Sequence, residues 1–141
     1  MPVEDDAGLL RVLESARAIA VLGIKAGEQD EAFRVPRYLQ RAGYRIAPVS
    51  PKLEAVLGER CAATLAQLAA PCELIDVFRA PAWLPGHVDE ILALPWRPRA
   101  VWFQLGIRDD ASAARLEAAG IEVVQNLCIM VEHRRLVGAP R

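Results

Sequence analysis

The amino-acid sequence predicts a single α/β domain, residues 1–141, in which helices cover both faces of a five-stranded parallel sheet. Three observations lead to this fold class. Five short apolar segments alternate with segments of helical periodicity, as in consecutive βαβ units. The first of these segments, Ala18–Leu22, is apolar on both faces, as a central parallel strand must be. A length of 141 residues suffices for one well-buried core and leaves no room for a second domain.

The N-terminal half contains two helix–strand units. A helix is expected over residues 9–16, where hydrophobic side chains form an apolar face, and it leads into the first strand. The next helix is expected over residues 32–41, so that Pro36 has to lie in its first turn, where a missing N–H is tolerated. Gly43 ends this helix as a C-cap residue, and the second strand is Arg45–Val49.

The C-terminal half continues the alternation. Thr64 is the expected N-cap of a short helical segment over residues 64–68, and Gly120 ends the helix that precedes the fifth strand. The remaining strands are expected at residues 74–78, 100–103 and 121–124, and the remaining helices at residues 85–94, 109–120 and 128–136. Right-handed crossovers between parallel strands then give a three-layer, doubly wound domain, Rossmann-like or flavodoxin-like, whose strand order is left open.

The composition excludes several classes of function. A net charge of -1 gives no general electrostatic reason to bind nucleic acid or an anionic membrane. No apolar run has the length of a membrane span, and the acidic N-terminus is unlike a signal peptide, so we expect a cytoplasmic protein. Three cysteines without a C-x-x-C pair argue against a disulfide framework and a four-ligand zinc site, and we expect no metal.

The loop after the first strand is the first candidate for ligand binding, because ligands of such sheets bind beyond the carboxyl ends of the strands. Gly23 and Gly27 are four residues apart, with Lys25 between them, so the G-x-G-x-x-G spacing of dinucleotide sites is absent. A glycine-bearing turn into a helix can hold an anion on free N–H groups. Taken alone, the same pattern also fits a turn without any ligand.

The residues after the second strand favour a phosphorylated ribose. A nicotinamide dinucleotide site places an acid there to hold the ribose hydroxyls, but this chain has Ser50 and Lys52, with no acid before Glu54. A cation at this point suits the phosphate of NADP or the 3′-phosphate of coenzyme A. After the third strand, Phe78 and Arg79 are suited to an adenine ring and a phosphate, although Phe78 also fits as the last core residue of its strand.

Two further strand ends carry polar residues. Gln104 stands where the fourth strand ends, and Gly106 allows the backbone to approach a ligand. The segment of residues 125–128 follows the fifth strand and is expected to cap the last helix.

At these positions the sequence resembles the CoA-binding family of small Rossmann-like proteins, which are similar to the CoA-binding domain of the succinyl-CoA synthetase alpha subunit. The resemblance runs from about residue 17 to residue 136. Three blocks in this order and spacing are together specific for it: Pro-x-x-Pro-Lys, Asp-Val-Phe-Arg and Trp-x-Gln-Leu-Gly. The matching residues are Ile19 to Gly23, Arg34-Val35, Tyr38-Leu39, Gly43 to Val49, Pro51-Lys52, Asp76 to Arg79, Val101 to Ile107, Cys128-Ile129 and Glu132-His133.

The resemblance implies a coenzyme A site along the crevice, with a CoA or acyl-CoA ligand. It implies that the first loop meets the pyrophosphate, the second turn the adenosine end and its 3′-phosphate, the third loop the adenine side, and the fourth loop the pantetheine. The implied site residues are, in that order, Gly23, Ile24, Lys25 and Ala26; Val49, Ser50, Pro51 and Lys52; Phe78 and Arg79; Gln104, Leu105 and Gly106; Arg34 completes the set.

The chain also departs from the family pattern. The family commonly has Asn where this chain has Ser50, and Ser-Tyr where it has Ala32-Phe33, so side-chain hydrogen bonds of the family site are expected to be lost. The synthetase carries a phosphorylated histidine in a second domain, for which this chain has no room, so the ligase activity is not carried over.

The sequence contains no constellation typical of an active site. Cys128 and His133 are five residues apart and do not share a helix face, and His87 has no partner at a helpful spacing. Asp109 and Asp110 fit the start of a helix better than paired acid–base work. We therefore expect a CoA-binding module without catalysis of its own, acting as a carrier, sensor or subunit with an unknown protein partner.

Two alternatives stay open from the residues alone. A small NADP-dependent oxidoreductase or redox-sensing domain is also consistent with the cation Lys52, although no Tyr–Lys pair for hydride transfer is apparent. The other alternative is a scaffold that binds no ligand.

Overall fold

The computed structural model describes residues 2–138 and confirms the predicted five-stranded parallel sheet. All neighbouring strands in this sheet are parallel, and their order is β2-β1-β5-β6-β7. The strands are β1 (Ala18–Leu22), β2 (Arg45–Val49), β5 (Leu74–Val77), β6 (Ala100–Phe103) and β7 (Glu122–Val124). Each lies within two residues of the predicted segment, because an apolar run bounded by turn residues is a strong strand signal.

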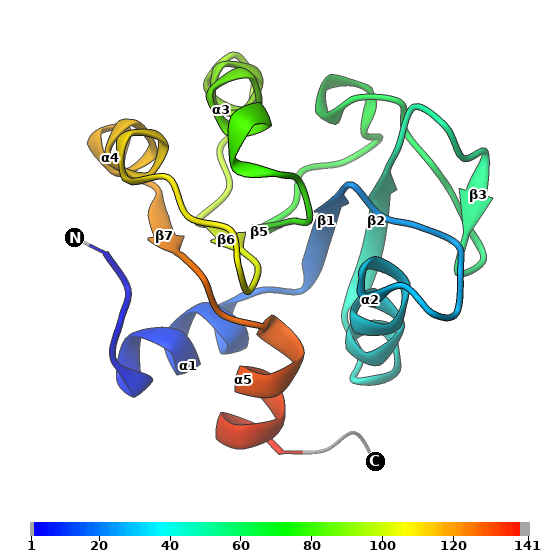
Figure 1. Ribbon diagram of the computed structural model, residues 1–141, viewed down its shortest axis with the longest axis horizontal. Coiled ribbons are helices and arrows are strands. Elements are labelled where there is room, and N and C mark those ends of the chain that lie inside the picture. The colour runs from blue at the N-terminus through cyan, green and yellow to red at the C-terminus, as the bar shows by residue number, and fades with distance from the viewer. Residues whose placement is uncertain (1, 139–141) are drawn as a thin grey trace.

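Helices cover both faces of the sheet, as predicted (Figure 1). On one face, α1 (Asp6–Ser15), α2 (Glu31–Arg41) and α5 (Ile129–Leu136) share a hydrophobic core with the sheet. On the other face, α3 (Leu84–Leu92) and α4 (Asp110–Ala118) share a second core. The result is a three-layer α/β Rossmann-like domain.

The two cores follow from the alternation of side chains along each strand. Ile19 and Val21 of β1 pack toward α1, α2 and α5, whereas Ala20 and Leu22 pack toward α3 and α4. On β6, the consecutive residues Trp102 and Phe103 are fully buried on opposite faces. Fully burying a side chain of this kind contributes about 1.5–3 kcal/mol, so β6 anchors both layers.

The strand order fixes where a ligand crevice can form. Counting only the strands of this sheet, the order is 2-1-3-4-5, which is the flavodoxin-like arrangement. The direction of winding reverses between β1 and β5, so the chain leads from β1 to α2 on one face of the sheet and from β5 to α3 on the other. The crevice expected from this topology therefore lies over β1 and β5.

Helix α2 differs from its prediction. It begins at Glu31, so that Pro36 is in the helix interior and not in the first turn. A proline there removes the N–H that would bond to the carbonyl four residues earlier, which is that of Ala32. The Ala32 carbonyl instead accepts a hydrogen bond from the Lys25 N–H at 3.1 Å. The helix tolerates Pro36 because the carbonyl that it leaves free is satisfied from outside the helix.

A small hairpin was not predicted. Its strands β3 (Ala55–Val56) and β4 (Glu59–Arg60) pair antiparallel and are joined by Leu57 and Gly58, both with positive φ. Strands of two residues carry no recognisable periodicity. Two short 3₁₀ helices, η1 (Leu65–Gln67) and η2 (Pro81–Trp83), complete the described elements, and η1 lies inside the helical segment predicted at residues 64–68.

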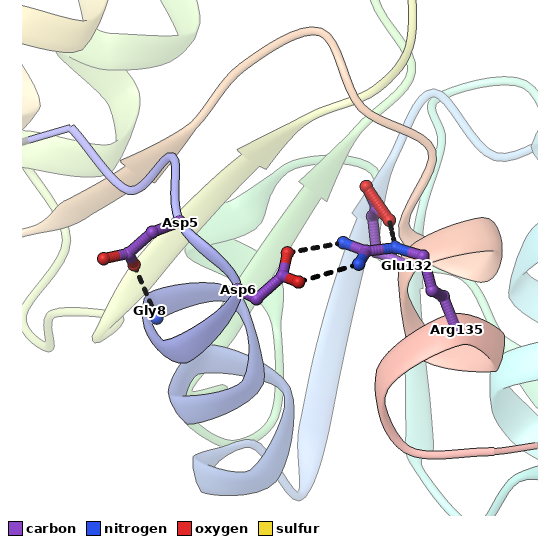
Figure 2. A network of polar contacts seen from close by, with 5 residues as sticks. All are labelled: Asp5, Asp6, Gly8, Glu132 and Arg135. Carbon is purple, nitrogen blue, oxygen red and sulfur yellow. Dashed lines mark hydrogen bonds and ion pairs between the residues drawn. The ribbon is translucent and has the colours of Figure 1, made fainter.

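The first and last helices are tied together at the surface. Figure 2 shows the Arg135 guanidinium donating two hydrogen bonds to the Asp6 carboxylate and one, from Nε, to Glu132. Asp5 caps the start of α1 by accepting a hydrogen bond from the Gly8 N–H at 2.9 Å. Among the helices of residues 2–138, none combines the length and apolar character that crossing a lipid bilayer requires.

Candidate functional site

A cavity of about 480 Å³ opens at the carboxyl edge of the sheet, at the crevice that the topology predicts. It is lined by the last residues of β1 and β2, by the loops after β1, β2 and β5, by two residues before η1 and by two residues of α3. These residues are Leu22, Gly23, Ile24, Lys25, Ala26, Asp30, Val49, Ser50, Pro51, Lys52, Leu53, Ala63, Thr64, Arg79, His87 and Glu90. A second cavity of about 270 Å³ adjoins it over β5 and β6. Lys25, Asp30 and Arg79 line both cavities, so these three residues form the boundary between them.

Gly23 allows the loops after β1 and β5 to approach one another. Its φ of +80° is a conformation that L side chains rarely adopt. A Cβ at this position would also lie only 2.5 Å from the Phe78 carbonyl oxygen and 3.0 Å from the Arg79 Cδ. Glycine is therefore required here by both the backbone conformation and the close contact.

The rest of the first loop is held against the start of α2. Besides the bond from the Lys25 N–H to the Ala32 carbonyl, the Asp30 N–H donates to the Gly27 carbonyl at 2.9 Å. Asp30 is the N-cap residue of α2, but its side chain makes no cap hydrogen bond. The N–H groups of Phe33 and Arg34 donate to the Asp30 carbonyl, both at 3.0 Å, whereas Glu31 and Ala32, the first two residues of α2, line the smaller cavity.

The Ser50 side chain closes the turn after β2 with hydrogen bonds of its own. Ser50 is buried, and its hydroxyl oxygen accepts from the N–H groups of Lys52 at 3.1 Å and Leu53 at 3.3 Å. The Ser50 N–H donates to the Ala62 carbonyl at 2.9 Å. Serine therefore supplies the side-chain acceptor that closes this turn, and the exposed Lys52 is carried on a fixed backbone.

His87 has partners, contrary to the prediction from sequence. The imidazole Nδ1 lies 3.0 Å from Glu90 Oε1, and the Nε2 accepts a hydrogen bond from Arg79 Nε at 3.3 Å. The second oxygen of Glu90 accepts from the Leu65 N–H at 3.1 Å. His87 and Glu90 are three residues apart on α3 and therefore project from one face of that helix, a spacing that could have indicated the pair from the sequence.

Gln104 lines the smaller cavity and also bonds to the start of α5. The side chain is 3% exposed, and its Oε1 accepts from the N–H of Ile129, the first residue of α5, at 3.1 Å. Cys128, the last residue of the predicted segment 125–128, is the N-cap residue of α5, but its side chain makes no cap hydrogen bond and Gln104 supplies the side-chain acceptor. Gln125 and Asn126 instead accept from the N–H groups of Asp109 and Gly106.

The charge lining the larger cavity is positive, although the whole chain carries a net charge of -1. Lys25, Lys52 and Arg79 contribute three cations, against the two carboxylates of Asp30 and Glu90. An anionic ligand would therefore be attracted by the positive charge of this crevice and not by the charge of the whole chain.

The comparisons with known proteins identify the family. The family model described as "CoA binding domain" matches residues 17–134 of the chain. The chain belongs to this CoA-binding domain family.

Three relatives illustrate the similarity. The chain is 30% identical to uncharacterized protein YneT of Bacillus subtilis over 127 residues, covering 90% of this chain and 93% of that protein. A solved structure from Thermus thermophilus shares 44% identity with a TM-score of 0.89, covering 94% of this chain and 99% of that one. A hypothetical protein from Pyrococcus horikoshii shares 29% identity with a TM-score of 0.90, covering 98% and 97%.

In this CoA-binding domain, most of the sequence-predicted site residues lie around the two cavities. The larger cavity collects Gly23, Ile24, Lys25, Ala26, Val49, Ser50, Pro51, Lys52 and Arg79. The smaller one collects Lys25, Phe78, Arg79, Gln104 and Leu105. Arg34 and Gly106 line neither cavity: Arg34 forms an ion pair with Glu31 on α2, and Gly106 donates its N–H to Asn126.

Two ionisable residues of the CoA-binding domain, His133 and Asp76, lie outside both cavities. The His133 Nδ1 is 2.8 Å from the Tyr38 hydroxyl, and its ring contacts Tyr38 and Tyr44 edge-on. Burial lowers the pKa of His133, which favours the neutral imidazole. Asp76 of β5 is fully buried, and neither of its carboxyl oxygens has a hydrogen-bond partner.

Proposed function

We propose that this chain binds coenzyme A, or an acyl-CoA, across the two cavities at the carboxyl edge of the sheet, without catalysis of its own. The observation that carries the proposal is the larger cavity, whose wall joins the glycine loop after β1, the Ser50–Lys52 turn after β2 and Arg79 after β5. Its volume lies in the usual range for small-molecule sites. Membership of the CoA-binding domain family supports this choice of ligand.

The pyrophosphate is assigned to the loop of residues 23–26 and the start of α2. The backbone can approach closely at Gly23, and the first turn of α2 presents N–H groups together with the positive end of the helix dipole. Lys25 and Arg79 line both cavities and so stand where a bridging diphosphate would pass. Charge-assisted hydrogen bonds from these groups are stronger than neutral ones.

The two ends of the ligand are assigned to opposite sides of that boundary. Lys52, on the rigid turn after β2, is suited to the ribose 3′-phosphate, with Val49 and Pro51 beside the adenosine. The pantetheine is assigned to the smaller cavity, which Phe78, Gln104 and Leu105 line. An extended ligand of this kind would pass the three residues that line both cavities, Lys25, Asp30 and Arg79.

The experiment is isothermal titration calorimetry with coenzyme A and with dephospho-CoA, which lacks only the 3′-phosphate. We expect saturable binding of coenzyme A, about tenfold or more weakened for dephospho-CoA, because one charge-assisted contact is lost. Lys52→Ala should weaken coenzyme A to the same extent and leave dephospho-CoA unaffected. Arg41→Ala, which removes an exposed charge of α2 outside both cavities, is the control.

Three results would contradict the proposal. One is the absence of any binding heat with coenzyme A and acetyl-CoA at millimolar ligand. Another is equal weakening of both ligands by Lys52→Ala, which would place the 3′-phosphate elsewhere. The third is tight binding of NADPH with no binding of coenzyme A, which would favour the dinucleotide alternative.

A further inference from the structure

A chain of hydrogen bonds runs along the α3 wall of the larger cavity and ends on Arg79. It begins at the Leu65 N–H, which donates to Glu90 Oε2 at 3.1 Å. The other carboxylate oxygen of Glu90 lies 3.0 Å from His87 Nδ1, and His87 Nε2 lies 3.3 Å from Arg79 Nε. Glu90, His87 and Arg79 all line the cavity, so this chain of contacts is part of its surface.

The direction of these contacts determines which ring nitrogen of His87 carries the proton. A guanidinium can only donate, so Nε2 must accept from Arg79 and is unprotonated. A carboxylate can only accept, so Nδ1 carries the proton and donates to Glu90. Glu90 therefore sets the tautomer of His87. In this tautomer the unprotonated Nε2 is the acceptor for the Arg79 Nε–H.

Arg79 is held at two points and keeps part of its guanidinium available. Its Nε–H is engaged by His87, and its Cζ lies 5.1 Å from the ring centroid of Trp83, which is 59% exposed. A cation over an indole face is attracted by the ring. Both contacts fix the plane of the guanidinium, whereas the described residues make no hydrogen bond to its two terminal amino groups.

Arg79 lies where its oriented guanidinium can contact a ligand that spans both cavities. Arg79 lines both cavities, and its Cδ lies 3.0 Å from where a Cβ of Gly23 would be. A guanidinium whose Nε is already bonded and whose plane is fixed presents its two terminal amino groups in a fork that matches phosphate oxygens. Less side-chain entropy is then lost when a phosphate binds.

We propose that His87 and Glu90 are positioning residues that orient the Arg79 fork at the boundary of the two cavities for binding a diphosphate. This inference rests on the proposed coenzyme A function for the identity of its ligand. It assigns the histidine no contact with the ligand, so that His87 acts only through Arg79.

Calorimetry with coenzyme A on four variants tests the proposal. Arg79→Ala should weaken binding by about tenfold to a hundredfold, and His87→Leu, which has no acceptor for the Arg79 Nε–H, by about fivefold. His87→Gln should recover most of the loss, because its amide oxygen can accept from Arg79 while its amino group donates to Glu90. The double variant Arg79→Ala with His87→Leu should bind no more weakly than Arg79→Ala alone.

Additive losses in the double variant, or equal losses for His87→Leu and His87→Gln, would overturn the proposal. Either result would mean that His87 acts on the ligand directly or only supports the fold. Thermal unfolding of each variant identifies any change that lowers affinity through partial unfolding.

A ligand-free measurement separates this inference from the proposed function. In ¹⁵N NMR spectra of the wild-type protein, we expect His87 as the tautomer protonated at Nδ1, and a protected Arg79 Nε–H. His87→Leu should remove that protection and His87→Gln should retain it. If coenzyme A does not bind but these signals appear, the function is wrong and the positioning stands; if the His87 proton is found on Nε2 instead, the positioning is wrong.

Discussion

At the residue scale, Gly23 is the position where the crevice depends on the absence of a side chain. A methyl group there would lie 2.5 Å from the Phe78 carbonyl oxygen, and the φ of +80° is itself unfavourable for alanine. Backbone cannot move aside as a flexible side chain can, so the loops after β1 and β5 must separate. The contact that shapes the crevice is therefore made by backbone on both sides.

We predict that Gly23→Ala lowers the free energy of unfolding by about 2 kcal/mol and weakens coenzyme A binding at least tenfold. Gly86→Ala on α3 is the matched control, because its φ is not positive and a Cβ there would meet nothing within 4 Å. That control should be neutral or stabilising by up to about 1 kcal/mol. Urea unfolding and calorimetry measure both effects, and a Gly23→Ala protein as stable as the wild type would contradict this view of the loop.

At the element scale, α2 and the first loop depend on one another through Pro36. Because Pro36 cannot donate to the Ala32 carbonyl, that carbonyl is available to the Lys25 N–H. The proline thus weakens the helix locally and at the same time provides the acceptor that holds the loop in place.

We predict that Pro36→Ala loosens the loop while leaving the helix intact. The new N–H at residue 36 would compete with Lys25 for the Ala32 carbonyl, so amide exchange at Lys25 should become about tenfold faster, and coenzyme A affinity should fall. The Asp30 amide, which donates to the Gly27 carbonyl, is an internal reference. Arg41→Ala in the same helix should change neither rate, and unchanged protection at Lys25 in Pro36→Ala would show that the loop does not depend on the proline.

The same helix shows where prediction from sequence stops. The strands were predicted closely, because an apolar run is a local signal that tertiary contacts reinforce. Helix α2 was predicted from about residue 32, which required Pro36 to lie in its first turn. The helix begins at Glu31 and Pro36 lies in its interior, where the Lys25 N–H satisfies the carbonyl that the proline leaves free. No local pattern contains that information.

The candidate site divides in the same way. The residues that directly follow strands, such as Lys52 and Arg79, could be predicted as neighbours because parallel strands end at one edge of the sheet. Asp30 and His87 line the cavity through the course of a loop and the orientation of a helix, which depend on how these elements pack. Arg34 was included on resemblance alone and lies on the outer surface of α2.

At the scale of the whole molecule, the least expected feature of the core is the carboxyl group of Asp76. It lies on the central strand β5, with Val21 and Trp102 as its register neighbours on the two flanking strands, and it is fully buried. Burial raises its pKa well above the usual value, and a weak interaction with the Val77 N–H opposes this only in part. The carboxyl group is therefore neutral in the folded protein under conditions in which it ionises in the unfolded chain.

This difference makes stability depend on pH in a defined direction. Above the pKa of the unfolded chain, near 4, the folded state holds a proton that the unfolded state has released. The contribution of Asp76 to stability is therefore greatest below that pH and decreases as the pH rises toward the folded-state pKa of Asp76. The slope for one such group is at most about 1.4 kcal/mol per pH unit.

We predict that Asp76→Asn, which has nearly the same shape and does not ionise, loses this component of the pH dependence. Urea unfolding at pH 4.5, 6 and 7.5 should show the variant gaining stability relative to the wild type as the pH rises toward the folded-state pKa of Asp76, because only the wild type must keep a proton in order to fold. Glu59→Gln, at an exposed position of β4, should follow the wild-type curve. A constant difference between Asp76→Asn and the wild type across this range would mean that Asp76 has the same protonation state in the folded and unfolded chains, and that the central strand accommodates a buried charge.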